Sequence, residues 1–513
     1  MAFAITQTCC NDASCVSVCP VNCIHPAPGE PDFGDTDMLY IDPQACIDCG
    51  ACADACPVDA IFSVESLSEQ LKPYAGLNAA YYADQAAGSA DPSPNFHVWD
   101  EPVFDRVIPA DFEPLDVAVV GTGPAGMYAV EDLLLHTNSR VTLIDRLPVA
   151  GGLVRHGVAP DHQATKKIGE TFARFHKHPR LRLRLGVEVG RDVTVDELAS
   201  RHDAVIYAVG ASSARGLGIP GEDLPGSLAA TDVVAWYNGH PDAPADAVDL
   251  AAERVVVVGN GNVALDVARI LTMDPEALAG TTISPAALAS LRSSKVREVV
   301  VLGRRGPEDA AYTRPELLGL AAQQDVDLVV DDHDPRIGEA IDAAADGSKA
   351  ALLRGVQREA VDWSAPPPHG QRRIVLRFHS APREVAGDTQ VRGLRVTGPA
   401  GGAGNASDAR DAGDVEVAAD LVIRAVGYRG TPVDGLPFDE RTGTIPHTGG
   451  RVDGRQRDYV VGWIKRGPSG GIGANRACAK ETVGTLLDEA IAGRLPRRDR
   501  PGVVRRMAQR VRG

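Results

Sequence analysis

The stretch Asp116–Gly126, D-V-A-V-V-G-T-G-P-A-G, decides the fold of the region around it. Its run V-A-V-V predicts a buried strand, and the spacing Gly121-x-Gly123-x-x-Gly126 predicts a tight turn into a helix. In such a turn the glycines let backbone N–H groups approach a pyrophosphate at the positive end of the helix. An acid at the end of the next strand typically binds a ribose, and Asp145 ends the next predicted strand. We therefore predict a dinucleotide-binding fold.

A second copy of this pattern follows at Arg254–Arg269, R-V-V-V-V-G-N-G-N-V-A-L-D-V-A-R. Its turn contains Gly259 and Gly261, and Ala264 stands in the third position, where close packing of helix on strand is the requirement. The next predicted strand, 296–302, ends in G-R-R-G, whereas an NAD enzyme would place an acid there. Two guanidiniums suit the 2′-phosphate of NADP(H), which they bind by charge-assisted bidentate hydrogen bonds. We therefore predict that this second unit binds NADP(H) rather than NAD(H).

Length and composition are those of a soluble globular protein. The chain has 513 residues, 44% hydrophobic and 24% charged, which corresponds to about three domains. The net charge of −17 argues against nucleic acid as a partner. We find no apolar run of about 18 residues and no basic segment at the N-terminus, so we expect no membrane span, no signal peptide and a cytoplasmic location.

Nine of the ten cysteines lie between Cys9 and Cys56. The second half of this region reads C-x2-C-x2-C-x3-C-P from Cys46 to Pro57, and three thiolates at this spacing can bind one face of an iron–sulfur cube. The first half, from Cys9 to Pro20, has the same spacing with Asp12 at the second ligand position. Zinc sites use a different spacing, and in a reducing cytoplasm such a cysteine cluster indicates metal binding rather than disulfides.

The ligand sets follow because, in two-cluster ferredoxins, the Cys before Pro ligates the other cluster. We predict a 4Fe–4S cluster II on Cys19, Cys46, Cys49 and Cys52, and a cluster I on Cys9, Asp12, Cys15 and Cys56. A carboxylate is a harder and weaker ligand for iron than a thiolate, so cluster I is either 3Fe–4S or 4Fe–4S with a labile corner. Cys10 and Cys23 are not expected to be ligands. The module resembles bacterial seven-iron or eight-iron ferredoxins.

The segment after Asp145 contains G-L-V-R-H-G-V-A-P-D-H, ending at His162. With the later stretch G-W-I-K-R-G-P-S-G-G-I-G of 462–473, it resembles ferredoxin–NADP reductases of the adrenodoxin-reductase type. The resemblance implies that FAD occupies the first dinucleotide fold and that 463–473 covers the isoalloxazine and nicotinamide. It also implies that His162 lies near the catalytic face, although a loop-capping histidine is the alternative. Glu316 resembles the family acid on the adenosine side of NADP, and Gly319 replaces a further acid.

These expectations give the following residues. FAD binding is expected at Gly121, Gly123, Ala125, Gly126, Asp145, Gly152, Leu153, Val187, Val189, Trp463, Gly470, Gly471 and Ile472. NADP binding is expected at Arg215, Gly259, Asn260, Gly261, Asn262, Val263, Arg304, Arg305, Glu316 and Gly470. His162 and Trp463 are expected at the catalytic face.

The predicted fold class is α/β with an α+β ferredoxin module: a two-cluster ferredoxin fold followed by two Rossmann-like dinucleotide-binding domains, for FAD and NADP. The expected boundaries are 1–65 for the ferredoxin, 66–115 for a linker, 116–220 and 421–493 for the FAD domain, 221–420 for the NADP domain and 494–513 for an Arg-rich tail. The linker is rich in Ala, Pro, Asp and Ser and is expected to act as a tether, with Tyr81, Tyr82 and Trp99 packing on a surface. Strands at 373–378 and 391–396 are expected in an antiparallel meander, and 398–413 in a loop.

The resemblance implies an NADPH–ferredoxin oxidoreductase, a ferredoxin–NADP(+) reductase, in which hydride passes between NADP(H) and FAD. Single electrons then pass between FAD and the iron–sulfur clusters, or to an external ferredoxin or cytochrome acceptor, a P450 system included. A disulfide reductase would need a cysteine pair near the flavin, and only Cys478 lies outside the module. The sequence of residues 462–468 does not support the alternative of a glutamate-synthase-type electron-transfer subunit. A non-enzymatic redox sensor, signalling by cluster loss at Asp12, is the alternative from another class.

Overall fold

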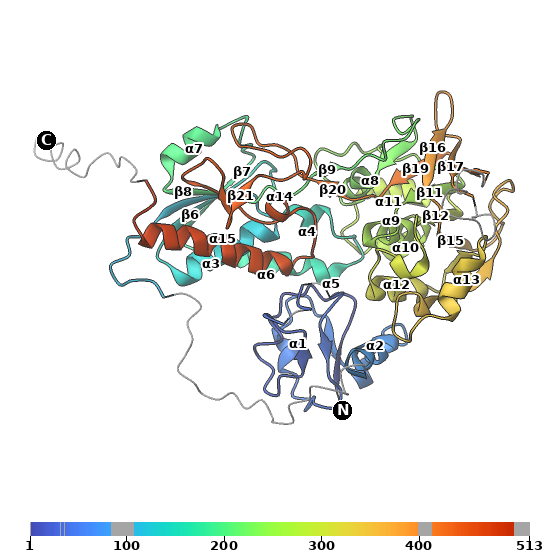
Figure 1. The fold of residues 1–513 in the computed structure, drawn as a ribbon, viewed down its shortest axis with the longest axis horizontal. Helices are drawn as coiled ribbons and strands as arrows, with labels where there is room; N and C mark the ends of the chain where they lie inside the picture. The colour runs from blue at the N-terminus through green and yellow to red at the C-terminus, as the bar shows by residue number, and fades with distance from the viewer. Residues whose placement is uncertain (1, 31, 35, 84–106, 399–412, 497–513) are drawn as a thin grey trace, which may run out of the picture. The chain divides into compact units, whose positions relative to one another are not determined.

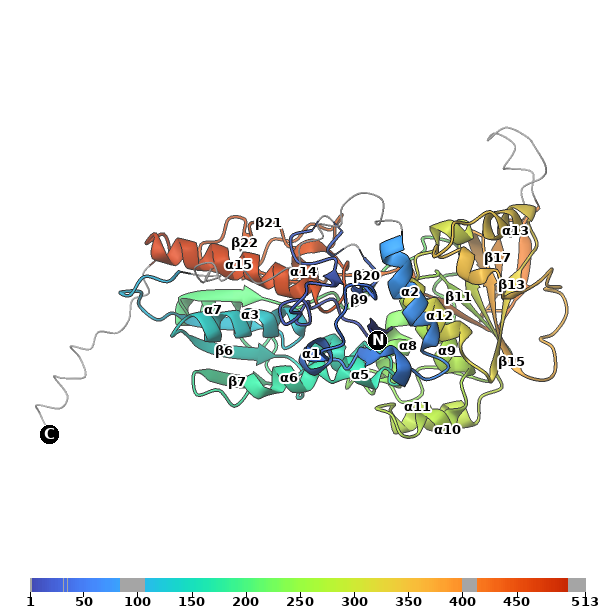
Figure 2. The ribbon, with the colours of Figure 1, turned by 90° about the horizontal axis from the view of Figure 1, so that it is seen from below.

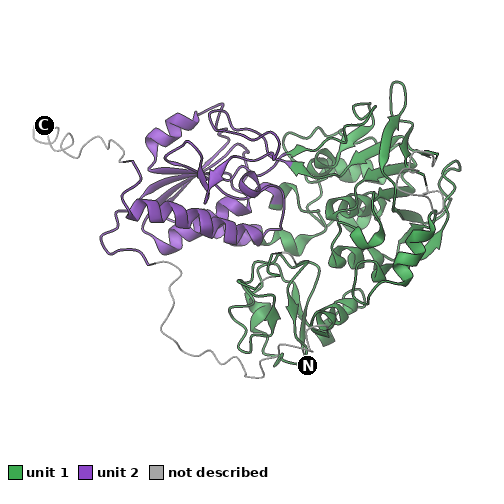
Figure 3. Ribbon diagram, in the orientation of Figure 1, with its two compact units in different colours: residues 1–99, 154–168, 213–428 green, residues 100–153, 169–212, 429–513 purple. Residues whose placement is uncertain are grey.

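The computed structural model describes residues 2–496 except 31, 35, 84–106 and 399–412. The chain divides into two compact units (Figure 3). Unit 1 comprises residues 1–99, 154–168 and 213–428, and unit 2 comprises residues 100–153, 169–212 and 429–513. Among the described helices, none is long and apolar enough to cross a membrane.

Unit 2 is built on one seven-stranded sheet, in the order β21-β22-β23-β8-β5-β6-β7 (Figure 1). The strands are β5 (Asp116–Val120), β6 (Arg140–Asp145), β7 (Leu181–Leu185), β8 (Ala204–Tyr207), β21 (His447–Thr448), β22 (Arg451–Val452) and β23 (Asp458–Val460). The strands from β23 to β7 run parallel, and β21 and β22 add an antiparallel edge. The helices are α3 (Pro124–His136), α6 (Ile168–Phe175), α7 (Val195–Arg201), α14 (Trp463–Arg466) and α15 (Ala474–Ile491). Helices α3 and α15 pack against each other (Figures 1 and 2).

Unit 1 contains a second seven-stranded sheet, all parallel, in the order β10-β19-β11-β12-β15-β13-β14. Its strands are β10 (Ser227–Ala229), β11 (Arg254–Val258), β12 (Glu298–Leu302), β13 (Val326–Asp331), β14 (Gln357–Glu359), β15 (Arg372–Arg377) and β19 (Leu421–Arg424). Helices α8 (Ala230–Tyr237), α9 (Asn262–Thr272), α10 (Pro275–Leu278), α11 (Pro285–Arg292), α12 (Arg314–Ala321) and α13 (Pro335–Asp342) accompany it, with short 3-10 turns η2 (Pro307–Asp309) and η3 (Ala351–Leu353). The central strands are buried on both faces, as parallel sheets require.

The remaining short elements of this region are α4 (Gly152–His156), α5 (Gln163–Lys166), β9 (Ser213–Ala214) and β20 (Tyr428–Arg429). A separate antiparallel sheet consists of β16 (Pro382–Ala386), β17 (Gly393–Val396) and β18 (Val415–Ala418). This small sheet confirms the expected meander for 391–396.

Two strands lie in a different sheet from the one that we expected. Residues 372–377 form β15, which runs parallel between β12 and β13 and so is not part of the meander. Residues 421–424, expected in the second part of the FAD domain, form β19, which pairs in parallel with β10 and β11. Both strands have the apolar pattern of buried strands, which predicts burial but does not say in which sheet. The chain enters unit 2 again only at Arg429.

The ferredoxin module has two small antiparallel sheets, β1 (Phe3–Ile5) with β4 (Ile61–Ser63) and β2 (Ile24–His25) with β3 (Tyr40–Ile41). The module also contains helix α1 (Ala51–Ala55) and the 3-10 turn η1 (Val64–Ser66).

Helix α2 (Lys72–Ala83) lies within the range expected for the linker, but it packs on the module. The buried Asn78 accepts hydrogen bonds from the backbone N–H groups of Ile5 and Ile41, at 3.2 and 2.9 Å. Tyr81 stacks on Tyr40 with ring centroids 4.3 Å apart, and the Tyr82 hydroxyl donates to the carbonyl oxygen of Tyr40 at 2.8 Å. The expected packing of the tyrosine pair is confirmed, whereas Trp99 and 84–106 lie outside the described residues.

Candidate functional site

The first glycine turn joins β5 to α3 in unit 2. Gly121 has a φ of +110°, and a Cβ there would collide with the carbonyl oxygen of Ala208. A Cβ on Gly126 would collide with the carbonyl oxygen of Gly121. Pro124 occupies the first turn of α3, where it costs no hydrogen bond and leaves the next N–H groups free for an anion. Only glycine fits at these two positions, and the turn has the form that a pyrophosphate requires.

Asp145 fixes this turn from the end of β6. One carboxylate oxygen accepts hydrogen bonds from the backbone N–H and the hydroxyl of Thr122, at 2.8 and 2.5 Å. The other accepts from the backbone N–H of Leu147 at 2.9 Å. A carboxylate has about four acceptor positions, so one remains for a ribose hydroxyl. The residue therefore holds the turn in shape as well as standing where the ribose is expected.

Of the other expected FAD residues of this part, Gly152 lies beside the same turn and Val187 lies beside the end of β6. Gly152 has a φ of +50°, and a Cβ there would lie 2.7 Å from the Cα atom of Gly123. The backbone N–H of Val187 donates to the carbonyl oxygen of Asp145 at 3.0 Å. Val187 and Val189 are partly buried against the core below β5 and β8. The structure thus gathers residues from three separate segments at the carboxyl end of the sheet.

The segment 462–473 also reaches this turn. Gly462 has a φ of +80°, and a Cβ there would lie 2.5 Å from the Cβ of Ala125 in the first turn of α3. The Trp463 indole N–H lies 3.1 Å from the carbonyl oxygen of Ser469 and 3.3 Å from that of Gly470. These bonds fold the stretch Gly470–Gly473 back onto Trp463, just before α15 begins at Ala474.

The second glycine turn joins β11 to α9 in unit 1 with the same local geometry. Gly259 has a φ of +115°, and a Cβ there would collide with the carbonyl oxygen of Ala425. Asn260 and Asn262 accept hydrogen bonds from the backbone N–H groups of Ala311 and Thr313, at 3.3 and 2.8 Å. The two asparagines therefore attach the turn to the loop that precedes α12.

The residues expected at the 2′-phosphate follow β12. Gly303 is buried, and a Cβ there would lie 2.5 Å from the amide nitrogen of Asn260. Arg304 and Arg305 are exposed next to it, and Arg305 lies 3.8 Å from the carboxylate of Asp309. Arg215 is also exposed, and its backbone N–H donates to the carbonyl oxygen of Gly427 at 3.0 Å. The two adjacent guanidiniums are accessible to an anion at the carboxyl end of β12.

His162, Asp266 and Glu316 form a cluster whose ligand atoms lie within 4.8 Å of one another. Asp266 comes from α9, one turn beyond the glycine turn, and burial raises the pKa of its carboxyl to about 7. Arg269 also comes from α9, and its guanidinium lies 3.0 Å from Nε2 of His162 and in contact with Asp266 and Asp161. Because Arg269 donates to Nε2, His162 acts as an acceptor there. Burial lowers the pKa of Arg269 to about 10.

This cluster suits proton handling better than a metal ion. The Arg269 guanidinium already supplies a positive charge in contact with Asp266 and His162, and it would repel a cation. Buried carboxyl groups with raised pKa values beside a histidine are typical of proton-transfer sites. Sequence reasoning missed Asp266 and Arg269. Their signal was a charged pair at positions 5 and 8 after Gly261, inside an otherwise apolar helix.

The predicted ligands of cluster II line one small cavity in the ferredoxin module. Cys19, Cys46, Cys49 and Cys52 surround it together with Cys23 and Ile47. Cys23 lies 3.5 Å from Cys19, sulfur to sulfur, although sequence reasoning assigned it no role. The structure therefore brings Cys19, from the first cysteine motif, beside the cysteines of the second motif.

The predicted ligands of cluster I also come together. Cys9 and Cys15 are each influenced electrostatically by Asp12 and Cys56, and burial raises the pKa of Cys9 to about 11. Asp12 is buried, and Ser14 donates a hydrogen bond to its carboxylate. Cys10 is buried beside the same group. Buried thiols with raised pKa values become thiolates only beside a strong positive charge, which iron supplies, and the residues present fit that group.

The backbone around these ligands is unusual. Among the described residues of the module, five that are not glycine have φ between +47° and +61°: Asn11, Ala13, Asn22, Asp48 and Asp59. Each left-handed residue costs free energy, and such residues persist where the surrounding structure requires them, often at functional sites. Here they bend the loops around the cysteines.

The module also contacts the start of α12 within unit 1. Asp37 accepts hydrogen bonds from the backbone N–H and Nε of Arg314, at 3.0 and 3.1 Å. The Tyr74 hydroxyl donates to the carbonyl oxygen of Pro315 at 2.7 Å. A Cβ on Gly319 points at the Gln7 amide oxygen. Helix α12 therefore contacts the module and also carries Glu316, a member of the cluster with His162 and Asp266.

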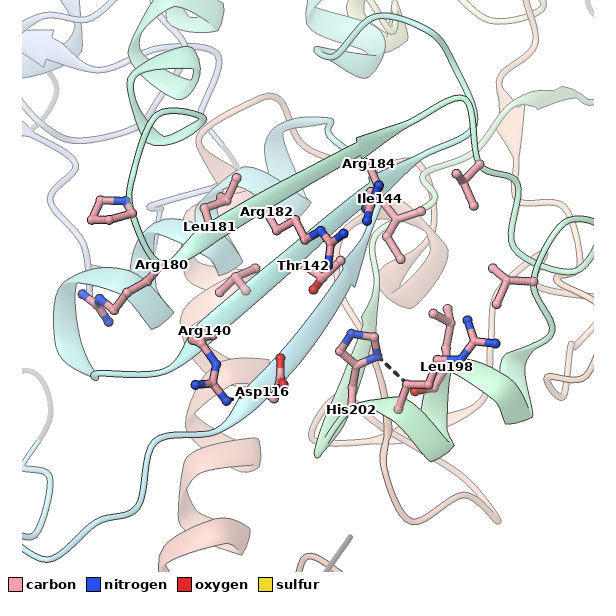
Figure 4. A pocket seen from close by; sticks show the side chains of 15 residues that line it. Asp116, Arg140, Thr142, Ile144, Arg180, Leu181, Arg182, Arg184, Leu198 and His202 are labelled. Carbon is pink, nitrogen blue, oxygen red and sulfur yellow. Dashed lines mark hydrogen bonds and ion pairs between the residues drawn. The ribbon is translucent and has the colours of Figure 1, made fainter. Parts of the chain in front are cut away.

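A hollow lies on one face of the unit 2 sheet. It measures about 630 Å³ and extends along β6 and β7, from Arg140 and Leu181 at their starts to Val187 beyond the end of β7. Figure 4 shows Arg182 and Arg184 of β7 on the same face as Thr142 and Ile144 of β6, which are their register partners. Val187, an expected FAD residue, also lines this hollow, so one end of the hollow reaches the carboxyl end of the sheet, where dinucleotides bind.

Comparisons with known proteins match both the cysteine module and the dinucleotide-binding part of the chain. The family "Pyridine nucleotide-disulphide oxidoreductase" matches residues 115–301, and "4Fe-4S binding domain" matches residues 39–62. The chain is 46% identical over 503 residues to a probable ferredoxin/ferredoxin–NADP reductase of Mycobacterium tuberculosis, covering 96% of this chain and 85% of that protein. It is 38% identical over 400 residues to mouse mitochondrial NADPH:adrenodoxin oxidoreductase, covering 76% and 81%. The structure of Mycobacterium tuberculosis FprA in complex with NADPH superposes with a TM-score of 0.67 at 44% identity, covering 75% of this chain and 87% of that one.

Proposed function

The chain belongs to the family of ferredoxin/ferredoxin–NADP reductases, and we propose from this premise that its two dinucleotide folds and its cysteine module form one electron-transfer chain. It is an NADPH–ferredoxin oxidoreductase with FAD, NADP(H) and a 4Fe–4S cluster as its cofactors. When bound, FAD exchanges a hydride with NADP(H) and single electrons with iron–sulfur clusters, so it connects a two-electron donor to one-electron carriers.

FAD is assigned to the turn Gly121–Gly126. The free N–H groups of α3 bind the pyrophosphate, and Asp145 uses its remaining acceptor position for the ribose. Gly152, Leu153, Val187 and Val189 line the flavin and adenine. Trp463 and the folded stretch Gly470–Ile472 cover the isoalloxazine. The single observation that supports this best is the convergence of Gly152 and Gly462 on the first turn of α3.

NADP(H) is assigned to the turn Gly259–Ala264 with Asn260, Asn262 and Val263. Arg304 and Arg305 bind the 2′-phosphate, because both are exposed at the carboxyl end of β12. Arg215 gives a further positive charge toward the nucleotide.

His162 acts with Asp266 and Glu316 at the nicotinamide end. We expected Glu316 on the adenosine side and His162 at the catalytic face. Because the two side chains lie in one cluster, both are assigned to the nicotinamide end. The cluster holds a proton on Asp266 below about pH 7. An ionised Asp266 favours the positive charge that develops on the nicotinamide ring as hydride leaves.

The finer assignments of the module are proposals. Cluster II takes Cys19, Cys46, Cys49 and Cys52, and cluster I takes Cys9, Cys15 and Cys56, with Asp12 at the fourth corner. The buried Asp12 supports a 3Fe–4S cluster or one with a labile iron, since a carboxylate binds iron less tightly than a thiolate. The acceptor beyond the module is an external ferredoxin or a cytochrome, a P450 system included. We place the protein in the cytoplasm, because free thiolate ligands need a reducing compartment.

Steady-state oxidation of NADPH tests this function. Ferricyanide accepts electrons directly from flavins, whereas cytochrome c is expected to receive them through the module. Cys49→Ser, which removes an exposed predicted ligand, should lower cytochrome c reduction about tenfold or more and leave ferricyanide reduction unchanged. The control is Ala45→Ser, in the same loop but not a ligand. Absence of turnover with every acceptor would contradict an enzyme and favour the redox sensor.

A further inference from the structure

Two large apolar side chains at the cluster II end of the module are exposed. Val18 is 40% exposed and precedes Cys19, and Ile47 is 59% exposed in the loop between Cys46 and Cys49. Ile47 also lines the cavity of the predicted cluster II ligands, beside Val21. Single exposed apolar residues are common, but both of these flank predicted ligands of cluster II, Val18 next to Cys19 and Ile47 next to Cys46.

The cluster I end of the module is already engaged within unit 1. Gln7, two residues before Cys9, faces Gly319 of α12 and lies 2.9 Å from the Tyr74 hydroxyl. Asp59, three residues after Cys56, forms an ion pair with Lys167. The residues that flank the cluster I ligands are thus in contact with the rest of unit 1, whereas Val18 and Ile47 beside cluster II are exposed.

The charge of the module indicates what kind of protein fits there. Residues 1–71 hold eleven acidic side chains and no Lys or Arg. Asp48 is exposed between Ile47 and Cys49, in the loop that carries two of the predicted ligands. An apolar centre with an acidic surround is complementary to an apolar centre with a basic rim, and such charge pairing steers the encounter of redox proteins.

We propose that Val18, Ile47 and Asp48 form an exit surface, on which a soluble one-electron acceptor protein with a basic rim around an apolar centre docks. This inference rests on the proposed function, in which electrons pass through the module. Each NADPH that is oxidised to NADP⁺ releases two electrons and one proton. Two acceptor molecules are therefore reduced per NADPH, one electron each, and the proton goes to solvent.

Binding of oxidised cytochrome c, a basic one-electron acceptor, to the holo-protein tests the exit surface without any turnover. The variant Val18→Lys/Ile47→Lys puts two positive charges on the surface, and calorimetry should show Kd raised about tenfold or more. The matched control Leu135→Lys/Ile491→Lys makes the same change at two other exposed apolar residues, 64% and 42% exposed on α3 and α15, and should leave Kd unchanged. KM for cytochrome c should rise in the exit variant in the same proportion as Kd. EPR should show that NADPH reduces the fused clusters of this variant as it does in the wild type.

Equal Kd values in the exit variant and the control would overturn the proposal. If the lysine variant loses iron, Val18→Ser/Ile47→Ser removes the apolar surface without adding charge, and Kd should still rise about threefold. Failure of the proposed function is seen separately, as wild-type clusters that NADPH does not reduce while cytochrome c still binds.

Discussion

The two glycine turns, Gly121–Gly126 in unit 2 and Gly259–Ala264 in unit 1, have the same backbone but different surroundings. In each, a positive φ at the first glycine brings the chain over a carbonyl oxygen of a neighbouring strand end, Ala208 or Ala425. The ends of the second strands differ, because Asp145 is buried and bound to its own turn, whereas Arg304 and Arg305 are exposed. In our proposal, the turn binds the pyrophosphate, and the end of the second strand decides which dinucleotide is bound.

The two helices that leave these turns also differ. On α3 the face toward the core is apolar along its length, with Met127, Val130 and Leu133 buried. Helix α9 carries the buried Arg269 and the partly buried Asp266, whose side chain is 15% exposed. A helix that only holds a cofactor needs an apolar face, whereas the charged pair on α9 lies next to His162. We therefore infer that α3 only binds a cofactor, whereas α9 also takes part in proton handling.

The largest effect is expected from placing a Cβ in either turn. Gly121→Ala should leave less than about a tenth of the protein with flavin, because the new methyl collides with the Ala208 carbonyl oxygen. Gly259→Ala should keep flavin and raise KM for NADPH about a hundredfold or more. Flavin absorbance and NADPH kinetics measure the two. A Gly259→Ala variant that lost flavin instead would show that the two assignments are exchanged.

The arginine pair is the next test. Arg304→Ala/Arg305→Ala should lower the preference for NADPH over NADH about a hundredfold, because two charge-assisted contacts to the 2′-phosphate are lost while NADH contacts remain. The ratio of kcat/KM values measures this. Arg292→Ala, at an exposed arginine of α11, is the control and should keep the preference. An unchanged ratio in the double variant would place the phosphate elsewhere.

Substitutions at the third position of each turn, Gly126 and Ala264, should have smaller effects, which appear in the free energy of unfolding. A Cβ on Gly126 would collide with the carbonyl oxygen of Gly121, so Gly126→Ala should cost about 1–3 kcal/mol of unfolding free energy. Ala264 is fully buried, and Ala264→Gly should cost about 1 kcal/mol, mainly from helix propensity. Denaturant unfolding of the holo-protein measures both. Equal costs would mean that the two turns pack their helices equally closely.

The smallest effect concerns pH. Burial raises the pKa of Asp266 to about 7, so the carboxylate forms above that pH and favours the charge that develops on NADPH as hydride leaves. We expect the stopped-flow rate of flavin reduction to rise a few-fold through pH 7. Asp266→Asn, which cannot ionise, should keep the low-pH rate throughout.

Stability gives an independent check on the same group. The folded-state pKa of Asp266 lies above its ordinary value of 3.8, so its contribution is fully present below pH 3.8 and is lost as pH rises to about 7. Asp266→Asn should therefore lose less stability than the wild type over that range. A variant with the wild-type pH dependence in both measurements would remove Asp266 from the mechanism.

The sequence predicted those features that depend on local sterics or ligand spacing. The glycine turns, the buried strands and the cysteine spacing are each set within about 25 residues of chain. In the described structure the turns form, and the residues of each predicted ligand group lie near one another. Cys19 beside Cys46 was also predictable, because the ligand exchange of two-cluster ferredoxins is a fixed pattern.

Features that depended on tertiary packing could not be predicted. Leu421–Arg424 has the same apolar pattern whichever sheet receives it, and its place between β10 and β11 is decided by long-range pairing. Helix α2 was assigned to the linker because of its composition, whereas the buried Asn78 holds it on the module by hydrogen bonds to two strands. The pairing of Asp266 with His162 joins segments about a hundred residues apart, and no local signal connects them.

The central claim is that electrons from NADPH reach the fused clusters through FAD. An anaerobic titration with NADPH, followed by EPR and by flavin absorbance on the same samples, tests it most directly. The account predicts that the flavin is reduced and that iron–sulfur signals of the module then change in the same titration. A flavin that is fully reduced while every iron–sulfur signal stays at its oxidised form would contradict the account.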